Sequence, residues 1–138
     1  MNRFLIGTLT LLAVALAVEV PQVQPKDLAA QLAKRGSAPA LIHVGPNVLY
    51  RSRHIPGSIY AGMAARSEGL EGLKAVVKDM PRDRDIVLYC GCCPWDHCPN
   101  IAPAIALLKQ MGFTRVKALY IANNFRSDWT DHGYPVEP

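Results

Sequence analysis

The chain carries its four cysteines within nine positions. Cys90, Cys92, Cys93 and Cys98 lie in one polar segment, with no cysteine elsewhere in the sequence. A thiolate is both a nucleophile and a ligand for soft metal ions. Four thiols so close together therefore predict sulfur chemistry or soft-metal binding, and their spacing alone does not decide between the two.

The elements on either side of this segment would position the thiols. Ile86–Tyr89 is a continuous apolar run typical of a buried strand, and Ile101–Met111 has the pattern of a helix, with Asn100 as its expected N-cap. Backbone N–H groups at a helix start stabilise a thiolate and lower its pKa. We therefore expect Cys90, at the end of the strand, to be an exposed nucleophile with a lowered pKa.

The remaining thiols allow several interpretations. Cys92, Cys93 and Cys98 could resolve or relay a sulfur atom bound to Cys90, because an adjacent thiol can attack a persulfide and release hydrosulfide. Disulfide exchange between Cys90 and Cys93 is another hypothesis, as is a catalytically inert loop stapled by disulfides. A further alternative is a module that binds a soft metal ion. In that case the ligands of Cu(I) or Zn would be Cys90, Cys92, Cys93, Cys98 and His97.

Four other residues are candidates for supporting the thiols. His97 could pair with a thiolate, Asp96 could accept hydrogen bonds from backbone N–H groups, and Trp95 could cover the loop. His43 lies within another apolar run, Ala40–Val44, and could lie near the same edge of the sheet, held by backbone hydrogen bonds.

Length and charge limit the classes of function. The chain has 138 residues, enough for one domain, and a net charge of +4 that is spread without a Lys/Arg block. We therefore expect no nucleic-acid partner. The alternation of patterns predicts an α/β fold, with a central parallel sheet of about five strands and helices on both faces. The predicted strands are Ala40–Val44, Ser58–Ala61, Ile86–Tyr89 and Val116–Ile121. The predicted helices are Lys26–Arg35, Leu70–Met80, Ile101–Met111 and Ser127–His132.

The amino-terminal residues have the composition of an export signal. Arg3 precedes the apolar stretch Phe4–Leu16, and Ala15-Leu16-Ala17 provides a small-x-small cleavage pattern. We expect residues 1–17 to be a signal peptide, whose removal leaves no stable membrane span. The protein would then be periplasmic or secreted, in an oxidising compartment.

Several short motifs, taken in order, resemble a rhodanese-like domain. Leu41–Val44 resembles the first strand of that family, and Arg53–Ile59 its HIPGA-type signature. Ile86–Cys90 is similar to the strand that delivers the catalytic cysteine, and Trp129 with Gly133–Val136 is similar to the closing W…GYPV. The resemblance spans residues 22–138.

The resemblance implies a function and a role for one cysteine. It implies that Cys90 takes a sulfane sulfur from a small donor, carries it as a persulfide and passes it to a thiol acceptor, which could be a periplasmic protein. No cofactor is required for this chemistry. The implied activity is that of a sulfurtransferase.

The loop also departs from the family pattern. It is longer by about four residues and has no Arg or Lys between Cys90 and Asn100, where the family usually carries an arginine. A dianionic donor needs positive charge, so we do not expect thiosulfate to be a favoured donor. Arg51, Arg53 and Arg126 are the candidates to supply that charge from other loops.

Overall fold

The structure is a computed structural model that describes residues 19–138. The predicted signal peptide, residues 1–17, lies outside the described residues. No helix in the described part is long and apolar enough to span a membrane. The strands are β1 (Gln22–Val23), β2 (Ala40–His43), β3 (Ile59–Tyr60), β4 (Ile86–Tyr89) and β5 (Val116–Leu119), and the α-helices are α1 (Pro25–Leu32), α2 (Asn47–Ser52), α3 (Ser67–Val77), α4 (Ile101–Gln110) and α5 (Phe125–Asp128).

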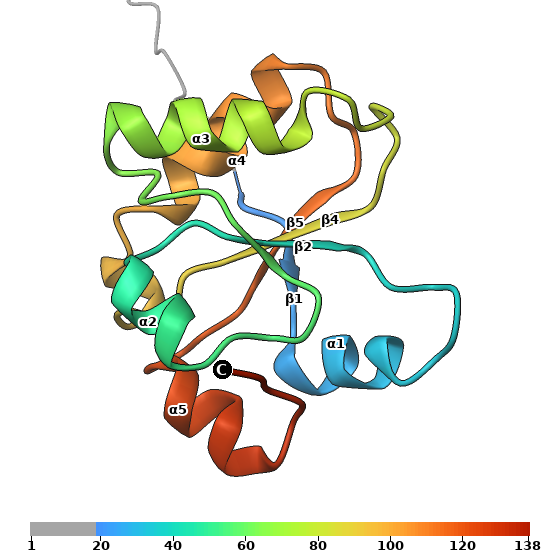
Figure 1. Ribbon diagram of the computed structural model, residues 1–138, viewed down its shortest axis with the longest axis vertical. Helices are drawn as coiled ribbons and strands as arrows, with labels where there is room; N and C mark the ends of the chain where they lie inside the picture. Colours follow the sequence, from blue (N-terminus) through green and yellow to red (C-terminus); the bar gives the residue numbers. More distant parts are fainter. Residues whose placement is uncertain (1–18) are drawn as a thin grey trace, which may run out of the picture.

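The strands form one five-stranded sheet in the order β1-β5-β4-β2-β3, and every pair is parallel (Figure 1). Helices α3 and α4 lie on one side of the sheet, whereas α1 and α5 lie on the other. The predicted α/β fold, with a central parallel sheet and helices on both faces, is therefore confirmed.

Strand β4 shows why this sequence makes a two-faced core. Its four residues are all buried, as expected of a central parallel strand. Successive side chains point to opposite faces, so Ile86 and Leu88 pack in the cluster that includes α3 and α4, while Val87 and Tyr89 pack with Trp129 in the other. Cys90 continues the phase of Ile86 and Leu88, and it therefore faces α4.

Some elements differ from those predicted. β1 has only two residues, too few for a strand pattern, and exists because Gln22 and Val23 pair with β5. α2 buries none of its residues, so it has no apolar periodicity to detect. The predicted closing helix Ser127–His132 is instead α5 followed by the 3₁₀-helix η2 (Thr130–His132).

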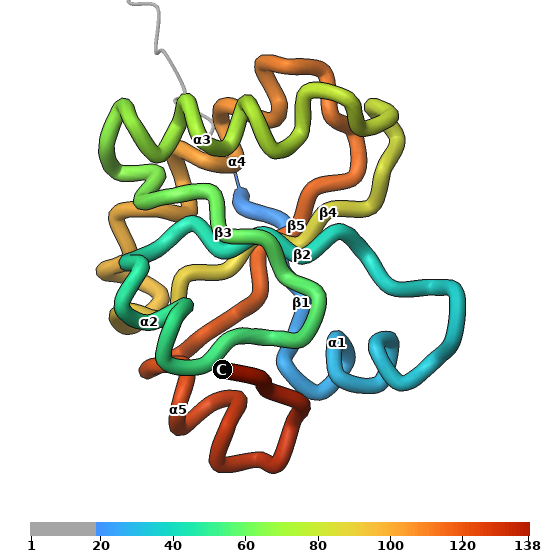
Figure 2. Tube along the Cα trace, in the orientation of Figure 1, coloured from blue at the N-terminus to red at the C-terminus, as the bar shows by residue number. Residues whose placement is uncertain are grey.

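The register of the sheet brings the site residues together. β2 and β4 are neighbours, with His43 opposite Tyr89, so the segments that follow them leave the sheet side by side (Figure 2). In parallel sheets this carboxyl-terminal edge is where ligands bind. Gly45, which follows β2, is consequently placed against Cys90.

Candidate functional site

Cys90 is the first residue after β4 and its side chain is almost fully buried, with 3% exposed. The expectation of an exposed sulfur is therefore wrong. The alternation of β4 directs the thiol inward, towards α4, and Gly45 packs over it so closely that a Cβ at Gly45 would lie 2.6 Å from Sγ of Cys90. Burial shields this sulfur from bulk water and from non-specific oxidants.

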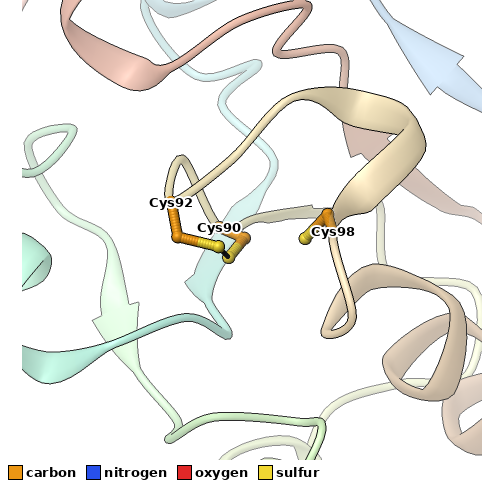
Figure 3. Close-up of side chains that lie close together, drawn as sticks. All are labelled: Cys90, Cys92 and Cys98. Atoms are coloured by element: carbon orange, nitrogen blue, oxygen red, sulfur yellow. Dashed lines mark hydrogen bonds between the residues drawn. The ribbon is translucent and has the colours of Figure 1, made fainter.

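Three thiols converge at this point. Sγ of Cys90 lies 3.1 Å from Sγ of Cys92, and the Sγ atoms of Cys90, Cys92 and Cys98 all lie within 4.8 Å of one another. Figure 3 shows Cys92 and Cys98 approaching Cys90 from opposite sides of the loop. Sγ of Cys93 is 2.8 Å from that of Cys92 but does not belong to the group of three. All four are free thiols.

The helix start acts on Cys98 and not, as expected from the sequence, on Cys90. The pKa of Cys98 is lowered to about 6, first by its interaction with Cys90 and then, against the opposing effect of burial, by backbone N–H groups of Asn100 and Ile101 at the start of α4. The pKa of Cys90 is raised, first by Cys98 and then by burial. These directions make Cys98 the thiol of the pair that loses its proton more readily.

Asn100 is a site residue that the sequence did not indicate as one. It precedes α4 as predicted, but its side chain makes no capping hydrogen bond. It is fully buried, and its Oδ1 accepts from the backbone N–H of Ala65 at 2.9 Å while Nδ2 donates to Sγ of Cys90 at 3.3 Å. Asn100 thus orients the Cys90 sulfur and offers a donor to any negative charge that develops there.

His43 lies beside the thiols as a neutral, buried ring. The backbone N–H of Gly45 donates to Nδ1 at 3.3 Å, which places the proton of the neutral ring on Nε2, and the ring meets Tyr89 edge-on with centroids 4.9 Å apart. Burial lowers the pKa of His43 to about 4, despite hydrogen bonding to the Cys90 backbone, which opposes the shift. His43 therefore brings no positive charge to the site at neutral pH.

The burial of His43 has a measurable consequence for stability. In the unfolded chain the imidazole takes up a proton near its ordinary pKa of 6.5, whereas the folded protein resists protonation down to about pH 4. The stabilisation is therefore complete above pH 6.5 and is lost as the pH falls towards 4, by about 3 kcal/mol. Urea unfolding of the wild type and of His43→Gln at pH 7.5, 6, 5 and 4 measures it. We expect the variant to lack this part of the pH dependence, and parallel curves for the two proteins would contradict the assignment.

The other loop residues surround the thiols at greater distance. Trp95 opens the 3₁₀-helix η1 (Trp95–His97), packs against Tyr120 with centroids 5.2 Å apart, and lines a small space together with Cys90, Cys93 and Cys98. Asp96 and His97 are exposed. The contact His97 makes to the cysteines is through its carbonyl oxygen, which accepts from Cys93 at 3.5 Å. Among the described residues, Cys90, Cys92 and Cys98 form the one group of three potential metal ligands.

A cavity of about 610 Å³ has Cys90 in its lining. Cys90, Cys92 and His43 line it at one end, and Arg53 and Arg126 contribute to its wall, whereas Arg51 does not line it. The tertiary structure thus brings two cations to the cavity that the loop itself lacks. Arg126 lies 3.6 Å from Asp131, which offsets part of its charge.

Gly91 shapes the boundary between the thiols and the cavity. Its φ of +72° is in the left-handed region, which favours glycine, and a Cβ there would lie 2.7 Å from Cβ of Phe125. The chain can turn away from β4 at this point because this residue has no side chain. The turn leads directly into the three-thiol group.

Comparisons with known proteins give one family and one fold. The family profile of the rhodanese-like domain matches residues 24–124. A protein from Bacillus halodurans is similar in structure, with a TM-score of 0.65 and 23% identity over 85% of this chain and 76% of that one. The rhodanese-like domain of an Anabaena protein has a TM-score of 0.61 and 22% identity, over 86% of this chain and 80% of that one. A single-domain sulfurtransferase from Saccharomyces cerevisiae has a TM-score of 0.61 and 13% identity, over 86% of this chain and 95% of that one. No curated protein matches the chain.

Proposed function

Since the chain belongs to the rhodanese-like domain family, we propose that it transfers sulfane sulfur through a persulfide on Cys90. One observation carries this proposal. Cys90 stands at the carboxyl end of β4, between a cavity large enough for a small donor and two further thiols within 4.8 Å. The cavity provides an entrance for the donor, and the two neighbouring thiols can take part in discharging the persulfide.

The loading step starts when the sulfur of Cys90 attacks the outer sulfur of a donor R–S–S⁻ that occupies the cavity. The proton of Cys90 passes to the departing sulfur of the donor. The S–S bond of the donor breaks, RS⁻ leaves with the bonding electron pair, and Cys90 becomes a persulfide. Nδ2 of Asn100, at 3.3 Å, donates to the reacting sulfur while it is charged. The step balances without an external oxidant or reductant.

The persulfide can be discharged in two ways. An acceptor thiolate that attacks the outer sulfur takes it away as a new persulfide and returns Cys90 as a thiolate. Alternatively, Cys98 or Cys92 attacks the inner sulfur, forms a disulfide with Cys90 and releases hydrosulfide, after which a dithiol reductant must restore the thiols. The closeness of all three sulfurs favours the second route whenever no external acceptor is present.

The setting of this chemistry is part of the proposal. If residues 1–17 direct export, the reaction takes place outside the cytoplasm, where a free thiol is exposed to oxidation. The burial of Cys90 supports a function there, because it limits unwanted disulfides with other molecules. The acceptor would be a small thiol or a thiol on a periplasmic protein.

The proposal is tested by mass spectrometry of the intact protein. The reduced protein is incubated with a sulfane donor without oxygen, the donor is removed, and the mass is measured before and after reduction. At early times, before Cys92 or Cys98 discharges the persulfide, we expect a gain of about 32 Da on the peptide that contains Cys90, reversed by dithiothreitol. Sulfur bound only to another cysteine, or neither this gain nor a donor-dependent disulfide of Cys90 with any donor, would refute the proposed function.

The two arginines of the cavity predict how the donor binds. We expect the double variant Arg53→Ala, Arg126→Ala to raise KM for an anionic donor such as thiosulfate about tenfold, with kcat nearly unchanged, because two cations are removed from the cavity wall. Steady-state kinetics at low ionic strength measures this. Arg51→Ala, on the same helix as Ser52 but outside the cavity, is the matched control and should change KM less than about twofold. An equal effect of both changes would show that the cavity does not receive the donor.

A further inference from the structure

The three converging sulfurs also form a set of metal ligands. We propose that Cys90, Cys92 and Cys98 bind one Cu(I) ion in a three-coordinate thiolate site. This goes beyond sulfur transfer, although both activities use Cys90. The proposal stands on the positions of the three Sγ atoms and on the hydrogen-bond donors around them.

The spacing of the sulfurs suits a three-coordinate ion. At a metal–sulfur distance of about 2.3 Å, three sulfurs in one plane with the ion lie about 4 Å apart. The three Sγ atoms here are within 4.8 Å of one another, so Cys98 is already at a suitable range. Cys92 needs to move outward by about 1 Å from its 3.1 Å contact with Cys90. A rotation of one side chain in a half-buried loop provides that movement.

The number of ligands favours Cu(I) over Zn. Structural Zn sites have four protein ligands in a tetrahedron. The described residues offer only three at this point, because His97 is exposed and Sγ of Cys93 lies outside the group. Cu(I) prefers soft thiolate ligands and is satisfied by three of them. The five-residue metal set expected from the sequence is thus reduced to three cysteines.

The surroundings of the sulfurs are built for negative charge. Three thiolates with one Cu(I) carry a net charge of −2, which needs donors in a half-buried site. Backbone N–H groups of Asn100 and Ile101 point at Cys98, and Nδ2 of Asn100 donates to Cys90. Such hydrogen bonds to the ligand sulfurs orient the thiolates and stabilise their negative charge. Trp95 lines a small apolar space together with Cys90 and Cys98.

Copper binding and sulfur loading exclude each other under this proposal. A Cys90 sulfur bound to Cu(I) is not available as a nucleophile, and a persulfide on Cys90 lengthens the side chain by one sulfur and disturbs the planar set. We therefore expect one equivalent of Cu(I) to suppress the mass gain of about 32 Da that the sulfane donor produces.

The test is a titration of the reduced protein with Cu(I) in the absence of oxygen, against a chromogenic Cu(I) chelator. We expect one copper per chain, and X-ray absorption that shows three sulfur neighbours. Cys92→Ser and Cys98→Ser should each weaken Cu(I) binding at least about 100-fold. Cys93→Ser is the matched control, from the same loop, and should bind as the wild type does. Less than one copper, zinc retained in preference to copper, or an equal loss in Cys93→Ser would overturn the proposal.

The copper and sulfur proposals fail separately. Sulfur uptake by the wild type without copper binding would remove the copper site and leave the proposed function in place. Copper binding without sulfur uptake from any donor would refute the proposed function and leave the copper site in place.

Discussion

Replacing Cys90 by serine is expected to abolish sulfur uptake completely. The hydroxyl group does not form a stable bond to sulfane sulfur under these conditions, and its pKa is far too high for it to act as a nucleophile. The remaining thiols lack the position between Asn100 and the cavity that Cys90 occupies. Intact mass spectrometry of Cys90→Ser after incubation with the donor should show no gain, where the wild type gains about 32 Da.

The same variant should keep its fold, which makes the loss interpretable. Serine is slightly smaller than cysteine, and its oxygen can accept the hydrogen bond from Nδ2 of Asn100. We expect a change in the free energy of unfolding of about 1 kcal/mol, measured by urea denaturation. Cys93→Ser, which leaves the three-thiol group intact, should load sulfur as the wild type does. Uptake that persists in Cys90→Ser would assign the persulfide to a different cysteine.

A methyl group at Gly45 is expected to have the second largest effect. The Cβ of Gly45→Ala would lie 2.6 Å from Sγ and 2.9 Å from the carbonyl oxygen of Cys90, both closer than such atoms can approach. The loop after β2 or the start of the cysteine loop must therefore shift, at a cost of about 1–3 kcal/mol for overpacking. The shift moves Sγ away from Asn100 and Cys98, so sulfur loading should slow at least about tenfold.

A second glycine separates the effect on the site from the general effect of alanine. Gly36 has a φ of +81°, and a Cβ there would have no neighbour within 4 Å. Gly36→Ala should therefore lower stability by about 1 kcal/mol through its backbone alone, with unchanged loading of Cys90. Rapid-quench loading experiments and urea unfolding on both variants make the comparison. If Gly45→Ala loads sulfur as fast as Gly36→Ala does, the close packing over Cys90 has no part in the reaction.

The two proposals concern the same loop because both depend on soft sulfur ligands held close together. A buried thiol next to a thiolate is suited to persulfide exchange, and three such sulfurs are suited to Cu(I). Cys98 has a part in each, as a thiol that can discharge the persulfide and as a metal ligand. Cys92 also has a part in each, since it lines the donor cavity and can serve as a metal ligand.

Much of the fold could be predicted because its determinants are local. Ile86–Tyr89 is recognisable as a strand from its uninterrupted apolar residues, because a central parallel strand is buried on both faces. The predicted helix Ile101–Met111 is found as Ile101–Gln110, because its apolar periodicity and Gly112 define its ends. The location of the four cysteines, in the loop between these two elements, follows from the sequence in the same way.

The chemistry within the loop depended on contacts between segments far apart in the chain. The sequence by itself determined the fold class and placed the thiols after β4. Only the tertiary structure decided that Gly45 buries Cys90, that Cys98 receives the backbone N–H groups of α4, and that Arg53 and Arg126 reach the cavity. The physical reason is that the pKa and exposure of a thiol depend on neighbours within a few ångströms, and the pairing of β2 with β4 supplies neighbours that are separated by more than 40 residues.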